Sequence, residues 1–367
     1  MGNFFLKELI TSNIESELEK IGFDIAYRTK ASDKFRYKTL KIFDLTLPQA
    51  NILKQTALSF GADCGVHREV LTSKIDKTDV ILGGSFSQLK KICDKLKQQP
   101  FSLKILAEDI ESQLQKNERK TKLVGILNIT PDSFSDGGKY YDSEEAIKQL
   151  NKLIEDGANI IDIGAESTKP GANPVSAEIQ IERLRPIFKN LPNIPISVDT
   201  RSSEVAKFAL DNGASIINDV SGMDFDLNMA KVVAKYNATL IIQHSTGDAG
   251  NIIQYKDVVE EVYLNLLKKV QFAQEKGINN IILDVGIGFG KTRENNFELL
   301  KRIDEFHSLK LPLMLGISRK SFLGIENNDN DLKDSLTLAL SYPLINKVDY
   351  LRVHNVKLHR QLLSSAI

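Results

Sequence analysis

The stretch LVGILNITPDSFSDGG, residues 123–138, opens the part of the chain that decides the fold. Its first half is apolar, as in a buried strand, and its second half is a turn-rich loop that carries Asn128, Thr130, Asp132 and Asp136. A segment that only stabilises the fold has little use for such closely spaced polar groups. The stretch therefore indicates a strand that leads into a loop built for a charged or polar ligand.

Seven further apolar runs follow, separated by amphipathic stretches of helical periodicity. The runs are NIIDIGAES, PISVDT, SIINDVSG, TLIIQH, IILDVGIG, LPLMLGIS and YLRVHNV. Strands that are apolar throughout are typical of parallel sheets covered on both faces. Eight strand–helix units in about 245 residues predict a TIM barrel for residues 122–367, with an open doubly wound sheet as the alternative.

Residues 1–115 have a different pattern: they carry GFDIAYR, RYKTLKIFDL, the helix-like LPQANILKQTALSFGA, and then DVILGGS and FSQLKKICDKLKQQ. We expect a small α/β domain there, joined to the barrel through the polar segment 112–122. No carboxylate pair, Cys/His cluster or phosphate loop stands out in it, so its role stays open.

The bulk composition narrows the class of protein. The 367 residues carry 48 Lys and Arg and 48 Asp and Glu, so the zero net charge argues against a nucleic-acid or membrane-surface partner. Two cysteines, Cys64 and Cys93, make no disulfide framework, and no apolar run approaches the ~18 residues of a membrane span. The first residues lack the pattern of a signal peptide, so we expect a cytoplasmic protein.

Polar residues end every predicted barrel strand, and in this fold the C-terminal strand ends form the active-site rim. The rim set comprises Asn128, Thr130, Glu166, Ser167, Thr168, Asp199, Thr200, Asn218, Asp219, His244, Ser245, Asp284, Ser318, Arg319, Lys320, Arg352 and His354. Polar strand ends are common singly because they meet solvent. A whole ring of them favours a polar ligand that supplies their partners.

The residue types in the ring suggest the chemistry of that ligand. Asp199, Asn218 and Asp284 offer acceptors to a flat heterocycle with an amino group and a ring N–H. The planar guanidinium of Arg352 can stack on such a ring and also bind an oxyanion.

Other rim residues suit an anion. His354, Lys320 and the Ser321 hydroxyl fit phosphate or carboxylate, and Asn128 is an oxygen ligand that Mg²⁺ accepts when phosphate and water supply the rest. The nearby GIGFGK matches neither a P-loop nor a dinucleotide fingerprint. Within it, Phe289 is either a wall for an aromatic substrate or a ring that packs under its own loop.

Seven ordered motifs, over roughly residues 122–360, closely resemble the dihydropteroate synthase family. They are GILNITPDSFSDGG, GANIIDIGAESTKPGA, ISVDTRSSEVA, IINDVSG, ILDVGIGFGKT, GISRKSFLG and LRVHNV. The resemblance implies that 6-hydroxymethyl-7,8-dihydropterin pyrophosphate and p-aminobenzoate give 7,8-dihydropteroate and pyrophosphate. It further implies an SN1-like course in which Mg-pyrophosphate leaves first, inhibition by sulfonamides, and a homodimer.

The resemblance also implies the site residues. The catalytic group comprises Lys320, Asp199, Arg352, His354 and Asp136, and the pterin contacts comprise Asp199, Asn218, Asp284, Lys320 and Arg352. The p-aminobenzoate site comprises Thr168, Lys169, Pro170, Phe134, Phe289 and Ser321. Pyrophosphate is assigned to Asn128, Arg352 and His354, and Mg²⁺ to Asn128.

The chain departs from the family pattern at a few positions. Lys169 replaces an arginine, which keeps the charge but loses bidentate geometry. Val285 stands where the family has proline, and Asn355 where it has aspartate. Gln243 and Ser245 replace methionines that flank His244. These departures bear on substrate and sulfonamide affinity, while the main polar contacts remain.

Three alternatives stay open at this point. A pterin-dependent methyltransferase domain would use the same Asp and Asn residues, although SRKSFLG and the pair Arg352 and His354 favour a pyrophosphate substrate. A non-catalytic pterin-binding protein is the second alternative. A lysine-based aldolase is the third, because Lys320 lies beyond a strand end.

Overall fold

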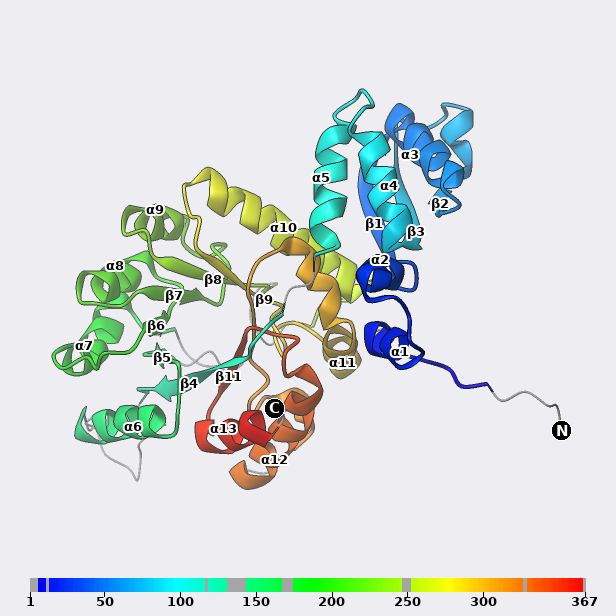
Figure 1. The fold of residues 1–367 in the computed structure, drawn as a ribbon. Coiled ribbons are helices and arrows are strands. Elements are labelled where there is room, and N and C mark those ends of the chain that lie inside the picture. Colours follow the sequence, from blue (N-terminus) through cyan, green and yellow to red (C-terminus); the bar gives the residue numbers. More distant parts are fainter. Residues whose placement is uncertain are drawn as a thin grey trace. The chain divides into compact units, whose positions relative to one another are not determined.

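The computed structural model describes residues 6–10, 13–115, 118–130, 143–166, 174–245, 252–325 and 329–365. The chain divides into two compact units, Met1–Asn117 and Glu118–Ile367 (Figure 1). Each unit has a hydrophobic core of its own. The segment predicted as a linker begins within the last turn of a helix, which ends at Gln113.

The first unit is a small α/β fold around an antiparallel sheet of strand order β1-β3-β2. Its strands are β1 (Tyr37–Thr46), β2 (Asp63–Val66) and β3 (Lys77–Ser85). Its helices are α1 (Ile14–Lys20), α2 (Arg28–Ser32), α3 (Leu47–Ser59), α4 (Phe86–Leu96) and α5 (Leu103–Gln113). The helices α3 and α4 both begin with a capping box, in which Thr46 pairs with Gln49 and Ser85 with Gln88.

The second unit confirms the predicted TIM barrel. Among the described residues, eight parallel strands close in the order β10-β11-β4-β5-β6-β7-β8-β9 (Figure 1). They are β4 (Lys122–Asn128), β5 (Ile160–Gly164), β6 (Ile196–Asp199), β7 (Ile216–Asp219), β8 (Thr239–Gln243), β9 (Ile281–Asp284), β10 (Leu313–Leu315) and β11 (Tyr350–Val353).

A helix follows each barrel strand, as the alternating pattern predicts. The helices are α6 (Ser143–Glu155), α7 (Ala177–Phe188), α8 (Ser203–Asp211), α9 (Asn228–Lys235), α10 (Val258–Glu275), α11 (Arg293–Lys301), α12 (Asn330–Ser341) and α13 (Val356–Ser365). Polar side chains cap several of them: Asp257 accepts from the N–H groups of Val259 and Glu260 at the start of α10.

The barrel interior is layered along the strands. Val124, Ile160, Ile216, Ile241, Ile282 and Met314 form one buried apolar layer. Because side chains on a strand alternate between its two faces, the residues two positions later face the interior as well. Those residues include Asp162, Asn218 and Asp284, and Arg352 stands two positions after Tyr350, which packs against the same layer. A layer of charged and polar residues therefore lies above the apolar layer, toward the C-terminal end of the barrel.

No helix in the described parts of the chain is both long and apolar enough to span a bilayer.

Candidate active site

Arg352 is the centre of a buried ion-pair network. Its Nε donates to Oδ2 of Asp162 over 2.6 Å, and its Nη2 donates to Oδ2 of Asp199 over 2.7 Å. Asp162 has no solvent exposure and also accepts from Ser197 Oγ (2.6 Å) and Asn218 Nδ2 (3.0 Å). The two carboxylates raise the pKa of the guanidinium against the effect of burial, so Arg352 stays charged.

Two buried acceptors in this network have no partner among the described residues. They are Oδ1 of Asp199 and Oδ1 of Asn218, on neighbouring strands β6 and β7. Burial raises the pKa of Asp199 to about 7, although Arg352 opposes the shift. Unpaired buried acceptors cost free energy, so the pair indicates a ligand with adjacent N–H donors.

Asp284 and Lys320 complete the polar layer on the other side of Arg352. Gly316 follows β10, and a Cβ built on it would lie 3.8 Å from Asp284 Oδ2 and 3.9 Å from both Lys320 Nζ and Arg352 Cδ. Gly316 therefore lies beside all three residues, with room for a methyl group in ordinary van der Waals contact. Burial raises the pKa of Asp284 and lowers that of Lys320 to about 8.

A glycine-rich turn, residues 286–290, supports Lys320. The Nζ of Lys320 donates to the carbonyl of Ile287 and lies 4.4 Å from the centroid of the Phe289 ring. Phe289 is half-buried, so the ring neither joins the core nor stands free. The contact is a cation–π interaction that places the Phe289 ring at the edge of the polar layer.

Behind this turn lies a second, more deeply buried lysine. Lys291 is only 6% exposed, and its Nζ lies 2.9 Å from the Gly286 carbonyl, 3.0 Å from the Phe289 carbonyl and 3.0 Å from Nδ1 of His244. Burial lowers the pKa of Lys291 to about 7 and holds that of His244 far below its ordinary value. His244 is therefore neutral and accepts through Nδ1.

The anion-binding residues of the prediction lie on the same rim. Ser318 Oγ is 2.9 Å from Nδ1 of His354 and accepts from the His354 backbone N–H over 3.2 Å, which fixes the ring. The Oδ1 of Asn128 lies beside Gly164, where a Cβ would approach it to 3.2 Å. Ser321 is exposed and begins a short 3₁₀ turn directly after Lys320.

Glu166 and Asp219, which follow or end two of the strands, bind residues of nearby loops. Glu166 accepts from Val175 N–H over 3.0 Å and pairs with Arg201 over 3.2 Å. Asp219 accepts from the backbone N–H groups of Ser221 and Met223. The prediction that a ligand supplies the partners of the rim residues is therefore wrong for Glu166 and Asp219.

The structure thus brings Asp199, Asn218, Asp284, Lys320 and Arg352 into one polar layer, with Phe289 and His354 at its border. The remaining predicted site residues lie outside the described part of the chain: Phe134, Asp136, Thr168, Lys169 and Pro170. Their assignments stay predictions.

Sequence reasoning missed Asp162 and Lys291 as site residues. Asp162 lies inside the apolar run NIIDIGAES, and a charge in the middle of a buried strand is the signal that marks it. Lys291 follows GIGFG, where a comparison with phosphate loops gave no match. Nothing in the spacing indicates that its amine turns inward to its own loop.

Three residues that depart from the family pattern are accommodated by burial or by hydrogen bonds to their neighbours. Val285 is fully buried. Asn355 caps α13 through Leu358 N–H and donates to Asp334 over 3.1 Å, while Asp334 also holds Arg319 by two bonds. Gln243 donates to the carbonyl of Val220 over 3.3 Å.

A protein-only metal centre has no basis in the described residues, which contain no group of three or more His, Cys, Asp or Glu side chains able to hold an ion. Asn128 is a single oxygen ligand, which suits a cation that takes its other ligands from phosphate and water. Its carboxamide makes no hydrogen bond to another described residue.

A family model described as "Pterin binding enzyme" matches residues 124–354, the barrel from its first strand to His354. Dihydropteroate synthase of Clostridium beijerinckii is 40% identical over 245 residues, which cover 65% of this chain and 90% of that protein. The bifunctional dihydropteroate synthase/dihydropteroate reductase of Helicobacter pylori is 31% identical over 371 residues, 98% of this chain and 97% of that protein.

Other relatives are longer than this chain. A probable bifunctional folylpolyglutamate synthase/dihydropteroate synthase of Haloferax volcanii is 35% identical over 341 residues, 84% of this chain. The chain spans 40% of the length of that protein.

Solved structures agree with the barrel. Dihydropteroate synthase of Xanthomonas albilineans with 4-aminobenzoic acid superposes with a TM-score of 0.63 at 34% identity, over 67% of this chain and 92% of that one. The enzyme of Clostridium difficile, solved in the presence of pteroic acid, gives a TM-score of 0.63 at 36% identity, over 69% and 98%. The chain therefore belongs to the family of pterin-binding enzymes, the family of the dihydropteroate synthases that it resembles.

Proposed function

We propose that this chain is a dihydropteroate synthase, which condenses 6-hydroxymethyl-7,8-dihydropterin pyrophosphate with p-aminobenzoate. The observation that carries the proposal is the pair of unpartnered buried acceptors, Oδ1 of Asp199 and Oδ1 of Asn218. A pterin presents an amino group and a ring N–H side by side, which match two adjacent acceptors. Asp284 and Lys320 both lie beside Gly316, where they can bind the rest of the ring.

The reaction breaks the bond between the pterin methylene carbon and the bridging oxygen, and the electron pair leaves with pyrophosphate. Arg352, held charged by Asp162 and Asp199, stabilises the negative charge on the leaving group. His354, with Nδ1 held by Ser318, presents Nε2 to the same anion. The carboxylates of Asp199 and Asp284 favour the positive charge that develops on the pterin.

The amine of p-aminobenzoate then attacks the methylene carbon and loses one proton. Phe289 would form one wall of its site, and Ser321 would bind its carboxylate, because both adjoin Lys320 at the exposed edge of the polar layer. Sulfonamides resemble p-aminobenzoate in shape, so they would compete for the same place.

Asn128 would hold Mg²⁺ together with the pyrophosphate oxygens. When bound, the ion would supply positive charge at the leaving group. Asn128 itself orients one oxygen toward this end of the site, since Gly164 beside it has no side chain to cover that oxygen.

A homodimer through α12 is part of the proposal. Leu332 and Leu336, one helical turn apart, are 47% and 37% exposed, and Tyr342 just after the helix is 63% exposed. Such a stripe suits a two-fold interface. Sedimentation of Leu336→Asp at several concentrations tests it, since the variant should lower the dimer fraction. A cytoplasmic location completes the proposal.

The test of the synthase is pyrophosphate release by the purified chain with dihydropterin pyrophosphate and Mg²⁺. Release should require p-aminobenzoate and should fall with added sulfonamide. Asp284→Ala should abolish it, whereas Asp349→Ala, at the opposite end of the barrel, should not. Tight pterin binding without turnover would favour the non-catalytic alternative.

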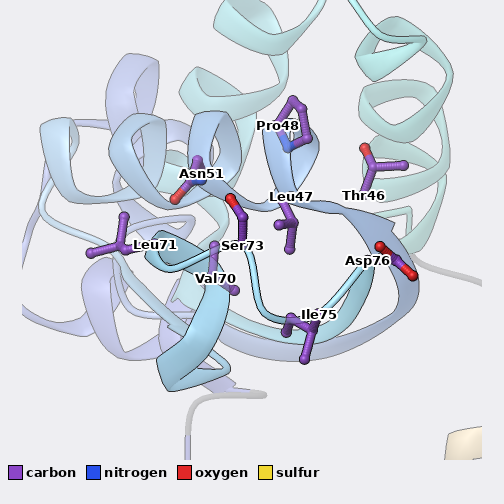
Figure 2. A pocket seen from close by; sticks show the side chains of 9 residues that line it. All are labelled: Thr46, Leu47, Pro48, Asn51, Val70, Leu71, Ser73, Ile75 and Asp76. Atoms are coloured by element: carbon purple, nitrogen blue, oxygen red, sulfur yellow. The ribbon is translucent and has the colours of Figure 1, made fainter.

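A second candidate function concerns the first unit. The Helicobacter pylori relative, whose name includes a dihydropteroate reductase, matches across both units rather than across the barrel alone. The first unit contains an open pocket of about 490 Å³ between the start of α3 and the segment 70–76, lined by both polar and apolar side chains, with Asn51, Ser73 and Asp76 among the polar ones (Figure 2). Reduction of 7,8-dihydropteroate by a hydride donor is therefore a candidate activity.

This candidate is tested separately from the condensation. The full chain is given 7,8-dihydropteroate with NADPH and free flavin, and tetrahydropteroate is measured. Asn51→Ala, which alters the pocket lining, should reduce this product and leave the condensation unchanged. No tetrahydropteroate under any of these conditions would remove the candidate.

A further inference from the structure

The buried amine of Lys291 has no role in the proposed reaction. Three acceptors converge on it: two carbonyls of the turn 286–290 and Nδ1 of His244. A lysine ammonium has three donors, one for each of these acceptors. The amine therefore fastens both ends of the turn to the end of strand β8.

Two residues of the turn 286–290 also contact Lys320. The Ile287 carbonyl accepts from Lys320 Nζ, and the Phe289 ring lies under it. Phe289 contacts both lysines, and Ile287 directly follows Gly286, whose carbonyl Lys291 binds. A change in the turn would thus move both supports of Lys320 together.

Other contacts also hold the turn, since Asp284 Oδ1 accepts from the Gly286 N–H over 2.8 Å and Asn296 Oδ1 accepts from the Gly288 N–H over 2.7 Å. Gly286 has φ +69°, and a Cβ there would stand 1.9 Å from the His244 carbonyl oxygen. The backbone is therefore pressed against the end of β8, with Lys291 as the side chain that bridges the two. Removing the amine takes a donor from the Phe289 carbonyl and from Nδ1 of His244, whereas the Gly286 carbonyl keeps the Phe289 N–H over 3.2 Å.

We propose that Lys291 is a positioning residue of the pterin site, which acts by holding the turn 286–290 so that Ile287 and Phe289 fix Lys320 beside Asp284. The proposal rests on the proposed function for the identity of the ligand. It predicts that loss of Lys291 weakens pterin binding only through Lys320.

The test measures binding of 6-hydroxymethyl-7,8-dihydropterin pyrophosphate to the full chain by calorimetry, which needs no turnover. Lys291→Met should weaken binding about tenfold, by the loss of a single positioned contact. Lys269→Met is the matched control. Lys269 is 8% exposed and holds another rim loop, through Ser221 and Asp224, without contact to Lys320. It should lower stability and leave pterin affinity within about twofold.

The decisive comparison is a double-mutant cycle with Lys320→Met. If Lys291 acts through Lys320, then Lys291→Met should weaken binding by less than about twofold once Lys320 is absent. The same tenfold factor in both backgrounds would overturn the proposal, as would unchanged binding in Lys291→Met alone or equal weakening by Lys269→Met.

Lys291→Gln is a second variant for the case that Lys291→Met does not fold. The glutamine amide keeps two of the three donors of the lysine ammonium. It should give a smaller weakening that also vanishes without Lys320, and persistence of its effect would count against the proposal.

Turnover of the unaltered chain is measured in parallel. Binding without turnover contradicts the proposed synthase but leaves this cycle interpretable, whereas no binding at all contradicts both.

Discussion

The Nε of Arg352, on the last barrel strand, donates to Oδ2 of Asp162 on the second strand over 2.6 Å. Asp162 is fully buried and accepts two further hydrogen bonds, from Ser197 and Asn218. One carboxylate thus positions both the guanidinium assigned to pyrophosphate and the carboxamide assigned to the pterin.

Replacement of Asp162 by Asn should therefore damage stability and binding together. Breaking a buried ion pair from one side costs about 3–5 kcal/mol, and an amide offers one acceptor oxygen where the carboxylate offers two. We expect more than a roughly tenfold loss of pterin affinity, measured by calorimetry beside urea unfolding.

The matched control is Asp349→Asn. Asp349 pairs with Arg119 and accepts from Leu313 N–H over 2.8 Å at the N-terminal end of the barrel. It should lose stability and keep pterin affinity. Equal affinity in Asp162→Asn and the unaltered chain would show that Asp162 has no part in the site.

Gly316→Ala should leave the fold intact and impair the site. The new methyl group would make ordinary contacts of 3.8–3.9 Å with Asp284, Lys320 and Arg352, so the free energy of unfolding should change little. It would, however, occupy the space proposed for the pterin, and KM for the pterin substrate should rise at least roughly tenfold.

Gly286→Ala should behave in the opposite way. Its Cβ would collide with the His244 carbonyl at 1.9 Å, so this variant should unfold at clearly lower denaturant concentration. A Gly316→Ala protein with normal KM would show that the space beside Gly316 does not hold the substrate.

The pH dependence of kcat/KM should be bell-shaped. Asp199, with a pKa raised to about 7, must be deprotonated to accept from the pterin, so activity rises as pH increases through this value. Lys320, with a pKa lowered to about 8, must be protonated, so activity falls as pH rises further. Lys320→Arg should remove the alkaline fall, because arginine keeps its charge. An alkaline limb that is unchanged in this variant would assign it to another group.

Ser318→Ala should lower kcat roughly tenfold, because Nδ1 of His354 loses the partner that directs Nε2–H to the leaving group. The control is Ser341→Ala, which removes a buried serine 3.2 Å from Nε2 of His359, between α12 and α13. Steady-state kinetics of the two variants should differ, and an equal effect on kcat would mean that the serine–histidine contact matters only for packing.

The sequence predicts the barrel because its signal is local and repeated: eight apolar runs, each followed by an amphipathic helix. It also predicts the layer of Asp199, Asn218, Asp284 and Arg352, since the fold brings all strand ends to one rim. It does not separate residues that face the centre from those that hold their own loops, such as Glu166 and Asp219. That choice depends on loop backbone geometry.

The roles of Asp162 and Lys291 cannot be predicted from the sequence, for a related reason. Each is a charged group whose partners come from distant parts of the chain: Arg352 is 190 residues from Asp162, and His244 is 47 residues from Lys291. A pattern of neighbours along the chain carries no information about such pairings. Only the closed barrel brings them together.

The most direct measurement is quantification of both products in one reaction, with dihydropterin pyrophosphate, Mg²⁺ and p-aminobenzoate supplied to the full chain. Mass spectrometry measures 7,8-dihydropteroate, and a coupled assay measures pyrophosphate. The account predicts equal amounts of the two from the unaltered chain and neither from Asp284→Ala. Pyrophosphate released without dihydropteroate, or no product despite bound pterin, would contradict it.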